Sequence, residues 1–305
     1  VHLAKSPFFV IDTAFYTKNK AEDLDVIFMY YWFQCIDINS MDSGSAIPST
    51  SRDEVYNLDI SLPSPEEQKA IASVLTSLDD KIDLLHRQNK TLEAMAETLF
   101  RQWFVEDKTL RMGNLSCLID CTLSGDWGKE FPEDDSIVPV NCIRGTDIAD
   151  LQNGLAKKTP LRYVNERKLQ TIEPKNGDII FEISGGTENQ STGRATYIND
   201  GVSSLFSYPL VFSNFCRLFR PKKPTQSYFL YAYLTHLYKQ DEFFGLENGS
   251  SGIKNLNYKA LLYDLKYPLP DDEAITWFHE QVSPFFDRIN QGKHQIQTLE
   301  HLRDT

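Results

Sequence analysis

Two carboxylates, Asp178 and Glu182, lie four residues apart in the segment GDIIFEIS (177–184), and Pro174 precedes them. Metal-dependent nucleases hold Mg²⁺ with carboxylates at neighbouring strand positions, so this spacing could support phosphodiester hydrolysis. Ser184, however, occupies the position where that nuclease pattern has a lysine. We therefore interpret the two carboxylates as a solvated strand end and predict no metal site.

Other catalytic patterns are absent from the sequence. The six histidines form no H-E-x-x-H pattern, and the chain has no nucleophile elbow and no N-P-P-[YF] or D-P-P-Y tetrapeptide of methyltransferases. The glycine-rich SGGTENQSTGR (184–194) lacks the G-K-[ST] ending of a P-loop. The sequence therefore predicts a protein without a catalytic site of its own.

The same glycine-rich loop carries side chains that suit base recognition. In the major groove of DNA, Asn and Gln amides pair with adenine, and Arg pairs with guanine. An ordinary polar surface loop is the alternative interpretation. We predict base contacts from Ser184, Gly185, Gly186, Thr187, Gln190 and Arg194.

Two further segments could contact phosphates, a basic run before this loop and a small polar loop after it. Serine hydroxyls, backbone amides and lysines position a protein on DNA without reading its sequence. A solvated charged face is the alternative for the basic run. We predict phosphate contacts from Lys157, Lys158, Arg162, Ser251 and Lys254.

The net charge of the chain, −12, argues at first against nucleic acid, because binding to phosphates needs clustered Lys and Arg. The distribution of charge changes this conclusion. Residues 140–270 hold 16 basic and 12 acidic side chains, so this stretch carries a net charge of +4 within an acidic chain. Any contact with a polyanion is therefore expected there.

A long helix precedes this stretch. Ser64 suits an N-cap, Pro65 suits the first helical position, and Glu67 completes a capping box. Apolar residues then alternate at spacings of four and three as far as Trp103, a heptad pattern typical of paired helices. Asn89 occupies one position of this pattern that would otherwise be apolar, and a polar residue there can fix the register between paired helices. The helix would be about 60 Å long, enough to separate the segments of the protein at its two ends.

The second half of the chain repeats the first. A shift of 207 positions places Ser64 on Asp271 and the tripeptide TLE (91–93) on TLE (298–300), which predicts a second capped helix that covers the first. Segments 177–184, 194–200 and 208–220 have the composition of strands, and about 226–239 that of a helix. The predicted helix seam contains Leu75, Leu78, Ile82, Leu85, Asn89, Leu92, Val282, Phe285, Ile289, Ile296 and Leu299.

Several motifs resemble a known family. LPSPEEQKAIASVLTSLDDKIDLLHRQNKTLEAMAETLFRQWF (62–104) is similar to the central spacer helix of the specificity subunit of type I restriction-modification systems, and residues 268–304 resemble a weaker second copy. GDWGKE (125–130), IRGTDI (143–148) and GSSGIKNLNYKALLYDLKYPLP (249–270) resemble the target-recognition domain of that family. FFVIDTAFY (8–16), together with the segment 44–63, resembles the closing part of a first such domain.

The resemblance implies an α+β fold in which mixed α/β recognition domains are joined by long antiparallel coiled-coil helices. Its four parts would be the end of a first target-recognition domain (1–63), a spacer helix (64–107), a second target-recognition domain (108–270) and a shortened second helix (271–305). The first domain is much shorter than the second, so the first half-site reader looks truncated.

The resemblance also implies a non-catalytic subunit that reads half of a bipartite target in double-stranded DNA. Modification (methyltransferase) subunits would dock on its helices and connect it to restriction subunits, with AdoMet, ATP and Mg²⁺ confined to those partners. Self-association through the helices is a further expectation. No apolar window approaches a membrane span, which predicts a cytoplasmic protein. The alternative is a coiled-coil adaptor whose globular domain binds protein instead of DNA.

Overall fold

The computed structural model describes residues 1–10, 14–20, 22–41, 52–156, 158–249 and 253–305. None of the helices in these ranges has the length and apolar character that crossing a bilayer requires. The α-helices are α1 (Val26–Gln34), α2 (Arg52–Tyr56), α3 (Pro65–Phe100), α4 (Ile148–Gln152), α5 (Glu166–Ile172), α6 (Asp200–Ser203), α7 (Ser227–Lys239) and α8 (Asp272–Asp304). The strands are β1 (Arg111–Gly113), β2 (Ile119–Ser124), β3 (Val138–Ile143), β4 (Leu161–Val164), β5 (Ile179–Glu182), β6 (Ser184–Gly185), β7 (Ala195–Tyr197), β8 (Leu210–Phe212), β9 (Cys216–Pro221), β10 (Glu247–Asn248), β11 (Lys254–Leu256) and β12 (Tyr267–Leu269).

The chain divides into two compact units, residues 1–82 with 302–305 and residues 83–301. In the first unit, α1 packs on the N-terminal part of α3. The Tyr31 hydroxyl donates a hydrogen bond to Asp79 Oδ2 at 2.8 Å. The backbone N–H of Asp25, the N-cap of α1, donates to Oε1 of the buried Gln68 at 2.8 Å. These polar contacts fix α1 against the start of the long helix.

The long helix α3 begins where the sequence predicts. The backbone N–H of Ser64 donates to Glu67 Oε2 at 3.0 Å, and the N–H of Glu67 donates to Ser64 Oγ at 3.3 Å, so the capping box forms. Before α8, Asp271 Oδ1 accepts a hydrogen bond from the N–H of Ala274 at 2.9 Å. The first residues of α3 and α8, Pro65 and Asp272, are therefore offset by the 207 positions of the internal repeat.

The second unit contains several small sheets of mixed topology. One sheet has the order β2-β9-β5-β7 with antiparallel neighbours, and another has the order β4-β3-β8, in which β3 and β8 are parallel. The strand pair β1-β12 and the sheet β10-β11-β6 complete the set. The strands predicted within 177–184, 194–200 and 208–220 form as β5, β7, β8 and β9. The architecture is α+β, with long helices and mixed sheets.

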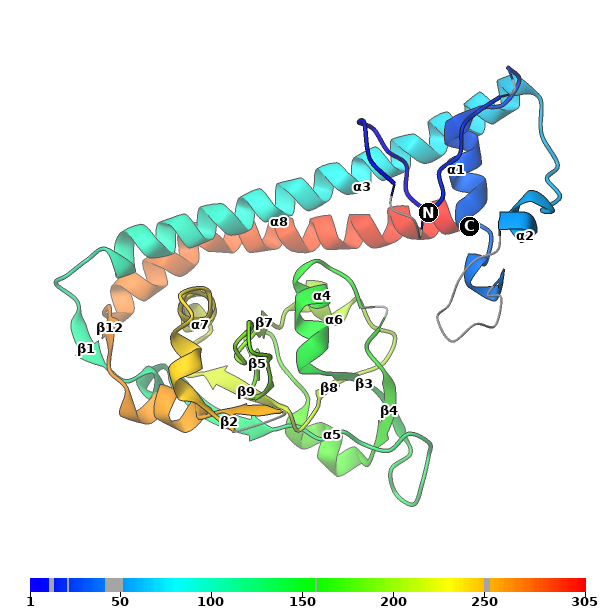
Figure 1. Ribbon diagram of the computed structural model, residues 1–305. Helices are drawn as coiled ribbons and strands as arrows, with labels where there is room; N and C mark the ends of the chain where they lie inside the picture. The colour runs from blue at the N-terminus through cyan, green and yellow to red at the C-terminus, as the bar shows by residue number, and fades with distance from the viewer. Residues whose placement is uncertain (11–13, 21, 42–51, 157, 250–252) are drawn as a thin grey trace. The chain divides into compact units, whose positions relative to one another are not determined.

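A cluster of aromatic side chains joins the helices to the sheets. Phe100 of α3 is fully buried, and its ring centroid lies 5.6 Å from that of Phe229 in α7 and 6.1 Å from that of Phe278 in α8. Helix α7 packs against strand β7, and Figure 1 shows α7 next to the long helix α8. The end of α3, the start of α8 and α7 therefore share one hydrophobic core with the domain.

Within the second unit α3 and α8 run antiparallel (Figure 1). Trp103 stacks on Trp277 near one end of the pair, and Asn89 faces Gly292 further along, so residue numbers fall in one helix as they rise in the other. A Cβ atom at position 292 would lie 2.5 Å from Asn89 Oδ1, so the glycine leaves the space that the Asn89 side chain occupies. Of the predicted seam residues, the buried ones are Ile82, Leu85, Asn89, Val282, Ile289 and Ile296, and the half-buried ones are Leu75, Leu78, Leu92, Phe285 and Leu299.

Replacing Asn89 with Leu is expected to raise the free energy of unfolding by about 1 kcal/mol, because Asn89 Oδ1 is buried and has no hydrogen-bond partner among the described residues. The two side chains have nearly the same shape, so Gly292 can still accommodate the change. Urea denaturation measures the effect, with Lys90→Leu at the adjacent exposed position as the control. A clear loss of stability in Asn89→Leu alone would contradict the assignment of Asn89 to the helix seam.

Candidate nucleic-acid interface

A groove of about 770 Å³ opens where the loops after β2, β3, β5 and β8 meet. The groove brings together all of the residues for which the sequence predicts base contacts. Its lining consists of Trp127, Arg144, Gly145, Thr146, Glu182, Ser184, Gly185, Gly186, Thr187, Gln190, Arg194, Asn214 and Phe215.

A buried ion pair forms the floor of this groove. Arg194 donates from Nε to Glu182 Oε2 at 2.9 Å and from Nη2 to Glu182 Oε1 at 2.6 Å, a bidentate geometry. The Glu182 side chain is 2% exposed and the Arg194 side chain 18% exposed. The hydrogen bonds to Glu182 raise the pKa of Arg194 above its ordinary value. The Arg194 guanidinium is thus bound internally, and base contact by Arg194 stays a prediction.

The prediction that Asp178 and Glu182 form a solvated strand end is wrong. Both carboxylates are buried, and each binds an arginine. Arg220 of β9 donates to both oxygens of Asp178, at 2.9 and 2.6 Å, because β9 pairs with β5 and places the two side chains together. Charges that are paired and hydrogen-bonded can be buried, whereas isolated charges cannot. Both acids therefore stabilise the fold and are not placed to hold a metal ion.

Glycines allow the surrounding loops to approach Glu182 closely. A Cβ atom on Gly145 would lie 2.5 Å from Glu182 Oε1, and one on Gly185 would lie 2.6 Å from the same oxygen. Gly186 has φ +71°, in the left-handed region that favours glycine. The GTD turn after β3 and the SGG turn after β5 therefore both close on the same carboxylate.

Strand β11 is joined to the SGG turn by strand pairing. In the antiparallel pair β6-β11, Lys254 lies opposite Gly185 and Asn255 lies opposite Ser184. The Lys254 ammonium binds Glu247 Oε2 at 2.9 Å, and its side chain is 25% exposed. Thus Lys254 lies beside the predicted base-contacting residues, although an internal carboxylate already neutralises its charge.

The predicted phosphate-contacting residues differ in their surroundings. The Lys158 side chain is 79% exposed, with its ammonium 3.8 Å from Asp150. Arg162 lies over the Trp127 ring at 4.5 Å and donates to the Trp127 carbonyl at 3.2 Å, so it positions the edge of the groove. Lys157 and Ser251 lie outside the described residues. The phosphate contacts stay predictions.

Five lining residues are absent from the predicted base contacts: Trp127, Arg144, Thr146, Asn214 and Phe215. The first three lie in the motifs GDWGKE and IRGTDI, whereas no motif pointed to the last two. Asn214 and Phe215 lie in the turn between β8 and β9, where the Phe215 carbonyl accepts hydrogen bonds from the N–H groups of Ile183 at 2.9 Å and Ser184 at 3.2 Å. The Phe215 side chain is nonetheless 47% exposed. An exposed aromatic beside an Asn, between two apolar strands, is the local signal that could have identified this turn.

The chemistry of the groove suits recognition of a polar surface. Thr146, Thr187, Gln190 and Asn214 are exposed donors and acceptors, and Phe215 adds an apolar contact. Gln190 Nε2 donates to the Tyr238 hydroxyl at 3.0 Å, which orients its amide. Among the described residues no group of three or more His, Cys, Asp or Glu side chains could hold a metal ion. The groove can therefore form hydrogen bonds and apolar contacts with a ligand edge.

Comparison with known proteins identifies the family. Residues 1–94 and 147–301 match the family model described as the type I restriction modification DNA specificity domain. This match covers most of the chain, so the chain belongs to that family, and the resemblance inferred from the helix and loop motifs is confirmed. The chain spans less than two thirds of the length of the curated relatives that it matches.

Individual relatives agree with this membership. The MjaIX specificity subunit of Methanocaldococcus jannaschii is 24% identical over 301 residues, and the match covers 91% of this chain and 66% of that protein. The HindI specificity subunit of Haemophilus influenzae is 41% identical over 64 residues, 21% of this chain and 14% of that protein. The crystal structure of the type I S subunit from M. genitalium is similar in fold, with a TM-score of 0.53, 17% identity and coverage of 92% of this chain and 71% of that chain.

Replacing Glu182 with Gln is expected to lower the free energy of unfolding by about 3 kcal/mol, because the largely buried Arg194 guanidinium loses its countercharge. Urea denaturation provides the measurement. Glu133→Gln is the matched control, because Glu133 and Lys129 form an exposed ion pair at 3.0 Å, and water screens such a pair so that its loss should change stability little. Equal losses in the two variants would show that the Glu182 ion pair does not organise the groove.

Proposed function

We propose that this chain reads one half of a bipartite target in double-stranded DNA as the specificity subunit of a type I restriction-modification complex. The groove beside β5 carries the proposal, because it gathers exposed amide and hydroxyl groups with an aromatic side chain in the stretch of positive net charge. Side-chain amides, hydroxyls and apolar groups are the groups that distinguish base edges. Membership of the DNA specificity family supports DNA as the polymer.

The base-contacting residues in this proposal are Ser184, Gly185, Gly186, Thr187 and Gln190, joined by Asn214 and Phe215. Arg194 contributes in two ways: it anchors the loop through Glu182, and it can reach a guanine only by exchanging that partner. Lys158 and Lys254 would contact phosphates at the groove edges, together with Lys157 and Ser251. The proposed recognition domain spans residues 108–270, and residues 1–63 would be the end of a first such domain.

The helices α3 and α8 are proposed to act as antiparallel spacers within residues 64–107 and 271–305. The common offset of 207 residues at their starts supports a duplicated unit of domain plus helix. In this proposal modification subunits dock on the helices and link the chain to restriction subunits. AdoMet, ATP and Mg²⁺ would be bound by those partners.

The function is tested by selecting this protein, mixed with a modification subunit, against a random duplex library at about 0.15 M salt, because affinity for DNA depends on salt. Enrichment of one short motif would support a single working half-site reader. Two motifs at a fixed spacing would support two readers, supplied by self-association or by residues 1–63. A stable complex with the modification subunit but no enriched motif would overturn DNA reading and favour a coiled-coil adaptor.

Replacing Phe215 with Ala is expected to weaken binding to the enriched duplex by about tenfold, the cost of one lost base contact. Binding to a scrambled duplex should change much less, because nonspecific affinity comes mainly from phosphates. Competition binding with both duplexes measures the difference. Phe131→Ala, at an aromatic that is 72% exposed and does not line the groove, is the control. Equal losses on both duplexes, or the same loss in Phe131→Ala, would contradict a role for Phe215 in base recognition.

A further inference from the structure

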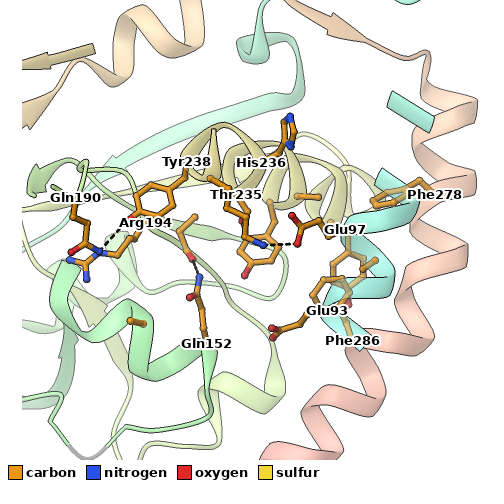
Figure 2. A pocket seen from close by; sticks show the side chains of 17 residues that line it. Glu93, Glu97, Gln152, Gln190, Arg194, Thr235, His236, Tyr238, Phe278 and Phe286 are labelled. Carbon is orange, nitrogen blue, oxygen red and sulfur yellow. Dashed lines mark hydrogen bonds and ion pairs between the residues drawn. The ribbon is translucent and has the colours of Figure 1, made fainter. Parts of the chain in front are cut away.

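A second cavity lies behind the groove, between α3, α7, α8 and the start of β7. Its volume is about 380 Å³, within the size range of small-molecule sites. Gln190 and Arg194 line both the groove and this cavity. Figure 2 shows Glu93 and Glu97 projecting from α3 into the cavity, with Gln152 on the opposite wall.

The charged groups around the cavity are paired, with one exception. The Lys239 ammonium binds Glu97 Oε2 at 2.5 Å, and Arg194 binds Glu182. Burial lowers the pKa of His236, so this imidazole is neutral near pH 7. Glu93 has no ion pair within 4.0 Å and no hydrogen bond among the described residues. The cavity therefore has one unpaired carboxylate in its wall.

A further cation that acts on Glu93 does not line the cavity. Lys293 of α8 is 7% exposed, and its ammonium donates to the Leu151 carbonyl at 3.2 Å. Burial raises the pKa of the Glu93 carboxyl, and the ammonium groups of Lys293 and Lys239 oppose that rise. Burial also lowers the pKa of Lys293, which forms no contact ion pair with Glu93.

The remaining walls of the cavity are mainly apolar and aromatic. They are formed by the side chains of Ala96, Tyr228, Tyr231, Ala232, Phe278 and Phe286. Mg²⁺ and Ca²⁺ require six or more oxygen ligands, which one free carboxylate among aromatic rings does not supply. An organic ammonium ion needs one carboxylate for its charge and aromatic surface for its hydrocarbon body, which the cavity does supply.

We propose that this cavity binds a small organic amine, with its ammonium group on the Glu93 carboxylate and its apolar body against Tyr231 and Phe286. The site is distinct from the groove proposed to read DNA, although the two share Gln190 and Arg194. Because the amine would contact the protein without DNA, its binding is measured independently of target recognition.

Isothermal titration of this chain at pH 7.5 with three probes of similar shape tests the proposal. The probes are phenethylamine, neutral 2-phenylethanol and anionic 3-phenylpropanoate. Phenethylamine should bind saturably at one site per chain, and the other two should bind at least about tenfold more weakly. Equal affinity of the amine and the alcohol, or no saturable amine binding up to about 10 mM, would overturn the proposal.

Variants of the protein locate the binding site. Glu93→Gln should weaken phenethylamine binding by about tenfold or more and remove the preference over the alcohol. Glu66→Gln removes the same charge from an exposed position of the same helix outside the cavity and should bind as the unmodified protein does. Ala232→Leu fills the cavity without changing its charge and should weaken the binding of the amine. Unchanged amine binding in both Glu93→Gln and Ala232→Leu would place the amine elsewhere and refute the assignment.

Discussion

The buried ion pair between Glu182 and Arg194 is the constraint on which the groove depends. A carboxylate that is almost inaccessible to water is stable only if a cation and hydrogen-bond donors surround it. Arg194 satisfies both oxygens, and the tight turns at Gly145 and Gly185 close around the same group. Loops that are distant in sequence therefore have one common anchor, which gives the exposed side chains of the groove defined positions.

The aromatic core around Phe100 connects this anchored groove to the helix pair. Phe100, Phe229 and Phe278 come from three different helices and share one hydrophobic cluster with β5. The Lys293 ammonium adds a polar link from α8 to the last turn of α4. Because close-packed interiors deform little, the domain and the adjoining part of the helix pair are expected to behave as one mechanical body. That rigidity is what a spacer requires if it is to set a distance.

Features that depend on local sequence could be predicted, and features that depend on distant pairing could not. The capping box at Ser64 and Glu67 is a local signal, and the groove loop from Ser184 to Arg194 is continuous in sequence. The burial of Asp178 depends instead on Arg220, which lies 42 positions away and is brought close by the β5-β9 pairing. Asn214 and Phe215 reach the groove for the same reason. The sequence identified the polar loop and the strands, but not how the strands pair to complete the site.

Because of the ion pairs, only part of the positive charge of residues 140–270 is available to bind phosphates. Arg194, Arg220 and Lys254 all bind internal carboxylates, so these three cations stabilise the fold before they can neutralise a phosphate. Lys158, by contrast, is largely exposed beside the groove. On the proposed function, neutral amides, hydroxyls and an aromatic ring supply discrimination between bases, and only part of the electrostatic affinity comes from this surface. On this proposal, an acidic chain would be selective for a sequence, and partner subunits would neutralise much of the DNA backbone.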